Sequence, residues 1–201
     1  MTSTLGALMG LLLISGGSPV AFADTYKPLV YYPSPRKSAF AQVPGYTVTL
    51  TAYNAVPEQT DSDPDITASG AFSNPEIIAA RSRDLAEALP FGTIIEIDGS
   101  QALKKNCGYD IVAPIVGYRV IADTMHQRFT DRIDVLFSIA DNYTLPDGKV
   151  KNAGLILGIC DGITIRVVGK ISRAEMKNLP ATQRELANLV HGISETDLAV
   201  K

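Results

Sequence analysis

Short apolar runs with strand periodicity, separated by long polar segments, constrain the fold of this chain more than any other feature. The first run, at 46–55, alternates Tyr46, Val48 and Leu50 with threonines, which is the two-residue period of a half-buried strand. Further runs lie at 76–82, 92–99, 117–123, 132–140 and 162–171. Because helical spacing is almost absent between these runs, we predict a mainly β fold, a small closed barrel rather than a sheet of βαβ units.

The N-terminus has the pattern of a targeting segment. An apolar stretch at 5–14 is followed by Gly, Pro and small residues up to Ala23, which is typical of a secretory signal peptide that is cleaved after Ala23. About 10 apolar residues are too few for a membrane span, which needs about 20, so no stable span is expected after cleavage. The alternative is an N-terminal anchor that is not removed.

Composition divides the rest of the chain. Residues 24–44 are rich in Pro and Tyr without periodicity, as in an extended arm or linker. Ser172 and Glu175 have the spacing of a capping box, and apolar residues at helical spacing follow, so the C-terminus is predicted to be a helical extension. The predicted parts are a signal peptide at 1–23, an N-terminal extended arm at 24–44, a barrel domain at 45–171 and a helical tail at 172–201.

Charge and cysteine content exclude some classes of partner and site. The net charge is −3 and no run of Lys or Arg occurs, which argues against a nucleic-acid partner. Export would place Cys107 and Cys160 in an oxidising compartment, where a disulfide between them is expected. Alternating aspartates at 61–65 lack the Gly and distal Glu of an EF-hand loop, so no metal site is predicted. We expect a monomer.

Two aspartates stand in apolar runs where a strand would normally bury hydrophobic residues. Asp123 ends the run at 117–123, and Asp134 lies within the run at 132–140. Strand alternation directs Asp134 away from the more apolar face of its own strand. Since an unpaired buried carboxylate costs several kcal/mol, Asp134 must border a cleft or pair with a cation. Asp123 can approach it if the two strands are neighbours.

The residues alone leave two interpretations of Asp134 open. In the structural one, its carboxylate is ion-paired with Arg132 or Arg128. In the catalytic one, two nearby carboxylates disfavour joint ionisation, so one of them stays protonated and acts as a general acid. Cleavage of a glycosidic bond requires such an acid, because the leaving oxygen must be protonated.

The stretch VIADTMHQRFTDRIDVLF resembles the signature of the three-Asp (3D) domain, found in the membrane-bound lytic transglycosylase A family and in related secreted cell-wall proteins. In that family a strand ending in Asp-Thr or Asp-Val leads through a loop to an Arg/His-φ-Asp strand. The two aspartates are 11 positions apart, like Asp123 and Asp134. The segments TAYNA, TASG and LPFGTIIEI are similar, in the same order, to the family's leading strand and two of its turns. The resemblance covers about residues 47–168.

This resemblance implies a six-stranded double-psi β-barrel and a peptidoglycan lytic transglycosylase in the periplasm or secreted from a bacterial cell. Such an enzyme cleaves the β-1,4 bond between N-acetylmuramic acid and N-acetylglucosamine without water or cofactor and leaves a 1,6-anhydro product. Asp134 matches the single acid/base, Asp123 the second aspartate and Asp84 the third. Residues expected to bind the glycan strand are Tyr53, Thr67, Gly70, His126, Arg128 and Arg132. Tyr53 has the alternative of a packing residue at the barrel edge.

The loop between the aspartates departs from the family pattern. Family members commonly have Gly-Gly-Ala-Ile-Lys-Gly where this chain has the bulkier residues 125–130. Either His126 and Arg128 replace the lost lysine, or the loop narrows the groove. The second case favours the alternative function, a non-catalytic cell-wall glycan-binding or envelope-assembly module on the same barrel.

Overall fold

The computed structural model of the protein describes residues 45–60, 63–103 and 105–192. The predicted signal peptide and extended arm lie outside the described residues. In the described ranges, no helix is both long and apolar enough to cross a membrane.

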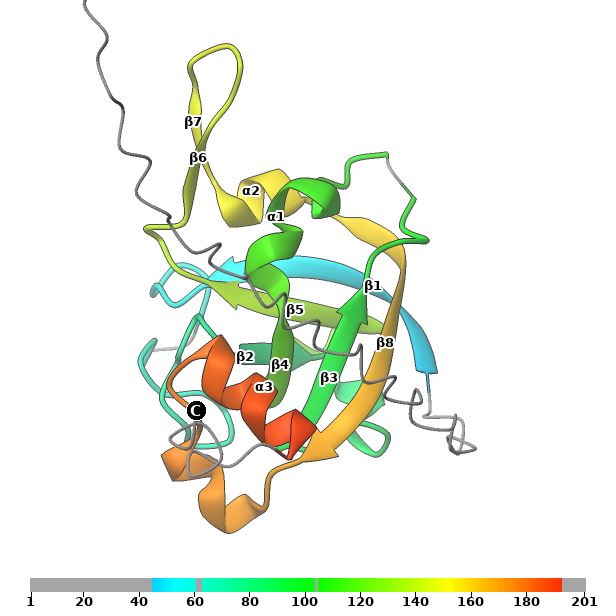
Figure 1. The fold of residues 1–201 in the computed structure, drawn as a ribbon, viewed down its shortest axis with the longest axis vertical. Coiled ribbons are helices and arrows are strands. Elements are labelled where there is room, and N and C mark those ends of the chain that lie inside the picture. Colours follow the sequence, from blue (N-terminus) through cyan, green and yellow to red (C-terminus); the bar gives the residue numbers. More distant parts are fainter. Residues whose placement is uncertain (1–44, 61–62, 104, 193–201) are drawn as a thin grey trace, which may run out of the picture. The chain divides into compact units, whose positions relative to one another are not determined.

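Six strands form a closed barrel in the order β1-β5-β2-β4-β3-β8 (Figure 1). Two of the pairings, β1 with β5 and β2 with β4, are parallel, and the other four are antiparallel. The predictions of a mainly β fold and of a barrel are therefore confirmed. The strands are β1 (Gly45–Asn54), β2 (Ile78–Arg81), β3 (Thr93–Asp98), β4 (Tyr118–Thr124), β5 (Arg132–Phe137) and β8 (Cys160–Lys170).

Strand alternation divides the core into two clusters. One collects residues from the same face of all six strands, and this face is the barrel interior; it includes Leu50, Ile121 and Val135. The other lies on the outer face and includes Leu136, Val120 and the tail residue Leu186. The barrel is therefore apolar on both faces where the tail covers it, which explains why the strands read as near-continuous apolar runs.

Short elements that the sequence did not predict occur between the strands. Helix α1 (Tyr109–Val116) and helix α2 (Ala153–Leu157) lie at one end of the barrel in Figure 1. The polar segment between the runs at 132–140 and 162–171 also contains a hairpin, β6 (Asn142–Thr144) with β7 (Val150–Asn152). Pro114 lies inside α1, and Pro normally disfavours a helix interior, which is why this segment gave no helical signal.

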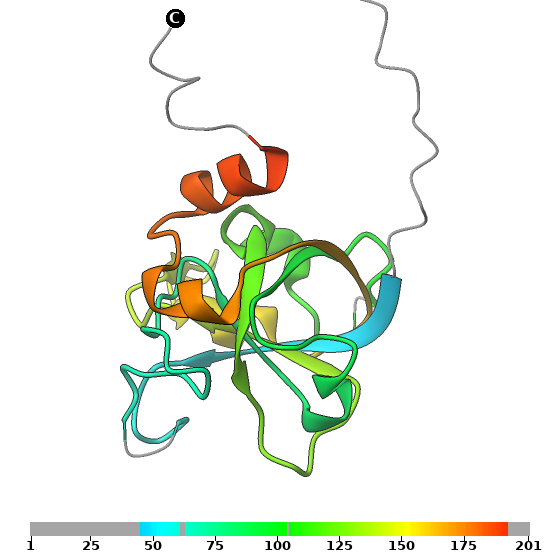
Figure 2. The same cartoon turned by 90° about the horizontal axis from the view of Figure 1, so that it is seen from below.

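The described part of the predicted tail contains two short helices. It consists of the 3-10 helix η2 (Arg173–Asn178) and helix α3 (Gln183–His191), which pack outside the barrel (Figure 2). The predicted capping box is present, with the Ser172 backbone N–H donating to the Glu175 carboxylate at 3.1 Å. Gln183 fixes α3 to β4, because its side-chain amide binds both the N–H and the carbonyl of Tyr118.

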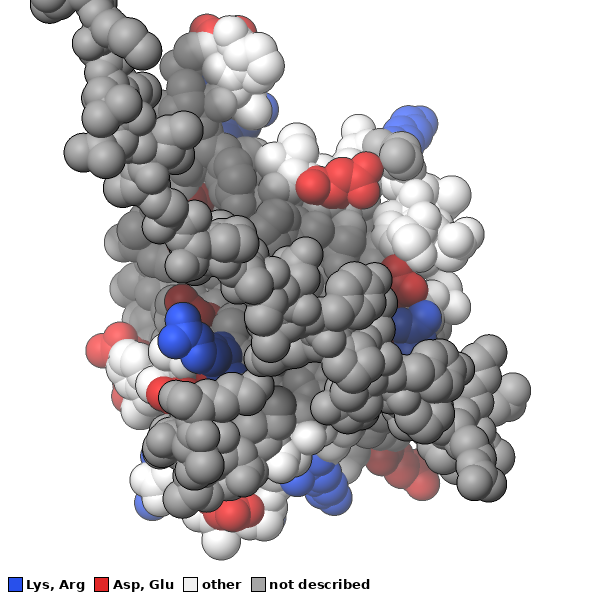
Figure 3. Space-filling model, in the orientation of Figure 1, with Lys and Arg blue, Asp and Glu red and all other residues white. Residues whose placement is uncertain are grey.

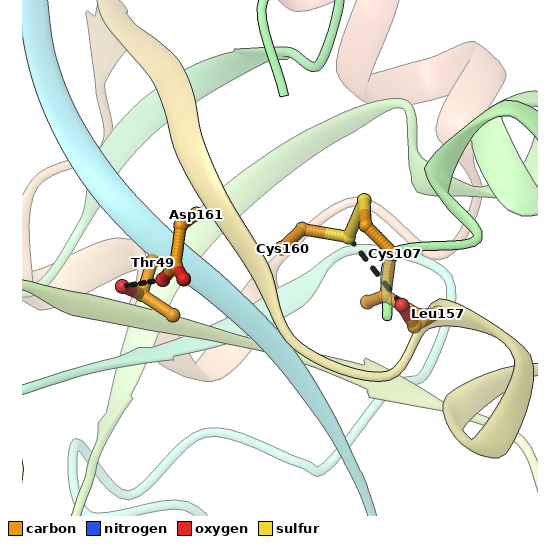
Figure 4. The surroundings of a disulfide bond; sticks show 5 residues. All are labelled: Thr49, Cys107, Leu157, Cys160 and Asp161. Carbon is orange, nitrogen blue, oxygen red and sulfur yellow. Dashed lines mark hydrogen bonds between the residues drawn. A yellow bond between two sulfur atoms is a disulfide. The ribbon is translucent and has the colours of Figure 1, made fainter. Parts of the chain in front are cut away.

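Cys107 and Cys160 form the predicted disulfide (Figure 4). The bond joins the segment before α1 to the first residue of β8, across 53 positions of sequence. Beside it, Thr49 of β1 donates a hydrogen bond to Asp161 of β8. The disulfide therefore attaches the helical end of the barrel to one of its strands.

Gly92 occupies a turn that only glycine fits. Its φ is +89°, and a Cβ at this position would lie 2.2 Å from the carbonyl oxygen of Ile171. Its backbone pairs on both sides, with Ile121 and with Ile171. We expect Gly92→Ala to lower the free energy of unfolding by about 2 to 3 kcal/mol, since both strain and overlap must be relieved. Urea denaturation measures this loss. Gly148→Ala, at φ +79° but with open space around the added Cβ, is the matched control and should cost less.

Candidate functional site

The two aspartates lie in one row that crosses four strands. Ala80 of β2 is paired with Asp134 of β5 on one side and with Asp123 of β4 on the other. Thr51 of β1 is paired with Asp134 in turn. The strands carrying the two aspartates are therefore not neighbours, because β2 lies between them. Ala80 separates the two acids with the smallest side chain that has a Cβ, which leaves room for a ligand between them.

This row forms the floor of a groove of about 570 Å³ on the outer face of the barrel. Such a volume is typical of sites for small molecules or short saccharides. One wall comes from the C-terminal ends of β2 and β4, and the other from the loop that follows β1. The lining residues are Ala52, Tyr53, Glu58, Gln59, Thr60, Pro64, Ile66, Ala68, Ser73, Ala80, Arg83, Asp123, Thr124, Met125, His126, Arg128, Phe129 and Asp134.

Asp134 has the environment of a general acid. The pKa of its carboxyl is raised from 3.8 to about 6, mainly by burial and to a smaller extent by the charge of Asp123. A hydrogen bond from the Thr51 hydroxyl, at 2.8 Å, and the charge of Arg132 oppose this rise. No ion pair joins Asp134 to Arg132 or Arg128, all three of which are described. The ion-pair interpretation is therefore not what the structure shows.

The raised pKa of Asp134 predicts a pH dependence of stability. Between pH 4 and pH 6 the carboxyl ionises in the unfolded chain but stays protonated in the folded one, so stability falls as the pH rises through this range. Asp134→Asn should remove this fall and raise the free energy of unfolding at pH 7 by about 2 to 3 kcal/mol. Denaturation at a series of pH values measures it. As a control, Glu87→Gln removes an exposed carboxylate and should show the same fall in the free energy of unfolding between pH 4 and pH 6 as the wild type. If Asp134→Asn also showed this fall unchanged, the prediction would be contradicted.

Asp123 is held by three donors. Its Oδ1 accepts from the backbone N–H groups of Thr124, at 2.8 Å, and Ala68, at 3.0 Å, and its Oδ2 accepts from the Tyr53 hydroxyl at 3.0 Å. These three donors hold the carboxyl group in one orientation. Burial and the charge of Asp123 raise the pKa of Tyr53 well above its usual value, so the phenol remains a donor. Asp123 is therefore held in place in the same row of residues as Asp134.

Tyr53 lines the groove and also packs in the core. The residue is only 9% exposed and belongs to the outer-face cluster, and its hydroxyl donates to Asp123. Tyr53 is therefore a packing residue that borders the groove, and its contact with a glycan stays a prediction.

Asp84, Thr67 and Gly70, which were predicted in the site, lie near the groove but do not line it. Asp84 is exposed, and its Oδ2 accepts from the backbone N–H of Asp131 at 2.9 Å. Burial is the largest single influence on the pKa of Asp84 and raises it, but the hydrogen bonds from Asp131 and Ser82 and the charge of Arg81 act together in the opposite direction, so the pKa is lowered. Thr67 is buried and bonds to the carbonyl of Ala71, and Gly70 provides the positive φ of the same turn. This turn presents the Ala68 N–H to Asp123, so its contribution to the site is indirect.

The bulky loop between the aspartates forms one wall of the groove. Met125, His126, Arg128 and Phe129 line it. The Phe129 ring is contacted by the guanidinium groups of Arg128, at 4.7 Å, and Arg132, at 4.8 Å from the ring centroid. Arg132 does not line the groove, and its buried Nε has no hydrogen-bond partner among the described residues.

Sequence reasoning missed four residues of the site. The Ala68 N–H donates to Asp123, and the Thr51 hydroxyl donates to Asp134. Ala80 lies between the two acids, and Arg83 lines the wall that starts at the ends of β2 and β4. Thr51 and Tyr53 are two positions apart on β1, so strand alternation predicts that their side chains lie on the same face of the strand. The positions of Ala80 and Ala68 depend on strand order and on a loop that folds back, for which no local signal exists.

The distribution of charged side chains bears on whether the protein binds a polyanion or a metal ion. On the face shown in Figure 3, acidic and basic side chains of described residues are interspersed. Within the described ranges, no group of three or more His, Cys, Asp or Glu side chains is arranged to hold a metal ion.

The sequence was compared with models of protein families and with curated proteins, and neither comparison finds a match. A function must therefore be inferred from the geometry of the groove together with the sequence motifs.

Proposed function

We propose that the protein is an exported lytic transglycosylase that cleaves glycan strands of peptidoglycan, built on a barrel of double-psi topology. The observation that carries the proposal is the groove that contains both Asp134, with its raised pKa, and the Asp123 carboxyl group, whose two oxygens accept hydrogen bonds. The resemblance of residues 120–137 to the 3D signature supports the same reaction. The two parallel pairs within a closed six-stranded barrel are compatible with the double-psi topology.

In the proposed mechanism Asp134 acts twice. Its protonated carboxyl donates to the glycosidic oxygen as the bond from that oxygen to C1 of the muramyl residue breaks. The carboxylate that remains accepts the proton of the C6 hydroxyl while O6 attacks C1. The product is a 1,6-anhydro ring, and Asp134 is protonated again. The Thr51 hydroxyl orients the carboxyl throughout, and the reaction requires no cofactor.

The surroundings of Asp123 favour this mechanism over hydrolysis. An inverting hydrolase needs a second carboxylate that is free to activate water. Both oxygens of Asp123 already accept hydrogen bonds, so it is better suited to stabilise positive charge that develops on the sugar ring. The nucleophile is then supplied by the substrate itself.

A second candidate is a cell-wall glycan-binding module without turnover. The observation that favours it is the bulky loop at 125–130, which stands where the family has Gly-Gly-Ala-Ile-Lys-Gly and brings Phe129 and Arg128 to the groove. These side chains narrow the groove beside Asp134.

Incubation with purified sacculi separates the two candidates. A transglycosylase should release soluble muropeptides with 1,6-anhydro ends, whereas a binding module should sediment with the sacculi and release none. Failure both to sediment and to release fragments would rule out both proposals.

A further inference from the structure

One wall of the groove is basic. Arg83, from the 3-10 helix η1 (Arg83–Ala86), and Arg128, from the loop after β4, both line it, and His126 lies in the same loop. The two segments are joined by backbone contacts. The Met125 N–H donates to the Arg81 carbonyl at 2.9 Å, and the Arg132 N–H donates to the Ser82 hydroxyl at 3.0 Å. Both segments start where parallel strands β2 and β4 end, at the same edge of the barrel wall.

The opposite wall has a different character. It starts at the C-terminal end of β1. Because β1 and β5 are parallel, this end lies beside the C-terminal end of β5, away from the ends of β2 and β4. Its lining residues include Glu58, Gln59 and Thr60. A ligand that crosses the floor between Asp123 and Asp134 therefore meets guanidinium groups along one side only.

The two arginines are not committed to internal ion pairs. Both are exposed, and in the described part of the chain neither has a carboxylate within ion-pair distance. The closest carboxylate in sequence, that of Asp84, accepts the backbone N–H of Asp131. Arg128 is held over the Phe129 ring at 4.7 Å from its centroid, which fixes the guanidinium plane and leaves its N–H groups available.

A guanidinium held in this way is suited to carboxylates, which it binds through two parallel hydrogen bonds. We propose that Arg83 and Arg128 make the groove selective for glycans that carry carboxylates beside the scissile bond. The carboxylate belongs either to the lactyl group of the muramyl sugar or to the peptide attached to it. This inference rests on the proposed function for the identity of the glycan. Arg128 belongs to the loop that departs from the family pattern, so the selectivity is a property of this chain.

Binding of three tetrasaccharides by calorimetry at low salt tests the proposal. The ligands are a neutral N-acetylglucosamine tetrasaccharide, a tetrasaccharide of alternating N-acetylglucosamine and N-acetylmuramic acid, and the latter with its peptides. All proteins carry Asp134→Asn, which prevents turnover. We expect at least one of the anionic ligands to bind about fivefold more tightly than the neutral one. A preference already present without peptides assigns the lactyl carboxylate, and one that appears only with peptides assigns the peptide.

The paired substitution Arg83→Gln and Arg128→Gln should abolish this preference, so that the anionic ligands bind no more tightly than the neutral tetrasaccharide. Arg173→Gln, which removes an exposed arginine of η2 outside the groove, should retain the preference. Equal affinities for all three ligands, no binding of any of them, or a preference that survives the paired substitution would overturn the proposal. If sacculi are cleaved but the preference is absent, this inference alone fails. If the preference is present but no anhydro product forms, the proposed reaction fails and the ligand class stands.

Discussion

Asp134→Asn should reduce the rate of glycan cleavage by about a thousandfold, the largest effect expected of any single substitution in the groove. The amide keeps the size of the carboxyl, and its oxygen still accepts from Thr51, so the groove is preserved. It supplies no acidic proton to the leaving oxygen and accepts none from the C6 hydroxyl. Turnover of soluble glycan strands, followed by chromatography, measures the loss.

The pH profile and a control variant separate this effect from a structural one. Because Asp134 must be protonated in the free enzyme, kcat/KM should fall as the pH rises through about 6. Asp161→Asn removes an exposed carboxylate that bonds to Thr49 on β1, outside the groove, and should keep most of the activity. Equal activity of wild type and Asp134→Asn would show that another group is the acid.

Arg119→Met should lower the free energy of unfolding by about 3 to 4 kcal/mol. Arg119 is fully buried, and its guanidinium donates to five backbone carbonyls. These carbonyls belong to Pro75, Ile78, Ile115, Val116 and Leu136. Methionine fills much of the volume but leaves these acceptors without a donor. Burial lowers the pKa of Arg119 to about 9, yet the side chain stays charged at neutral pH.

The matched control for Arg119 is Arg166, which also lies on a barrel strand. Arg166 is partly exposed and forms surface ion pairs with Glu96, at 3.2 Å, and Asp98, at 3.0 Å. Arg166→Met should therefore lower the free energy of unfolding much less than Arg119→Met does, because exposed ion pairs contribute little. The midpoints of urea denaturation give both values. Similar losses for the two variants would contradict the role assigned to the carbonyl contacts of Arg119.

Much of the barrel could be predicted from local patterns. Alternation located all six barrel strands, because each must present an apolar face to the interior. In β5 it also placed Asp134 on the face opposite Val135, and the structure has Asp134 in the groove and Val135 in the interior. The capping box at Ser172 was found because both of its residues are local.

The rest depends on long-range pairing, which has no local signature. No local pattern indicates that β2 lies between β4 and β5, yet this order decides that Ala80 separates the two acids. The fold of the loop after β1 decides that Ala68 binds Asp123. Asp84 was predicted in the site from its place in a motif, whereas its side chain supports the turn at Asp131.

The most direct test of the central proposal, that Asp134 cleaves glycan with the sugar's own hydroxyl as the nucleophile, is digestion of peptidoglycan in water enriched in heavy oxygen. Mass spectrometry of the new glycan ends then shows where the attacking oxygen came from. The proposal predicts anhydro ends that are one water lighter than reducing ends and contain no heavy oxygen, and predicts none of them with Asp134→Asn. Reducing ends labelled with heavy oxygen would contradict it and would show that the groove activates water instead.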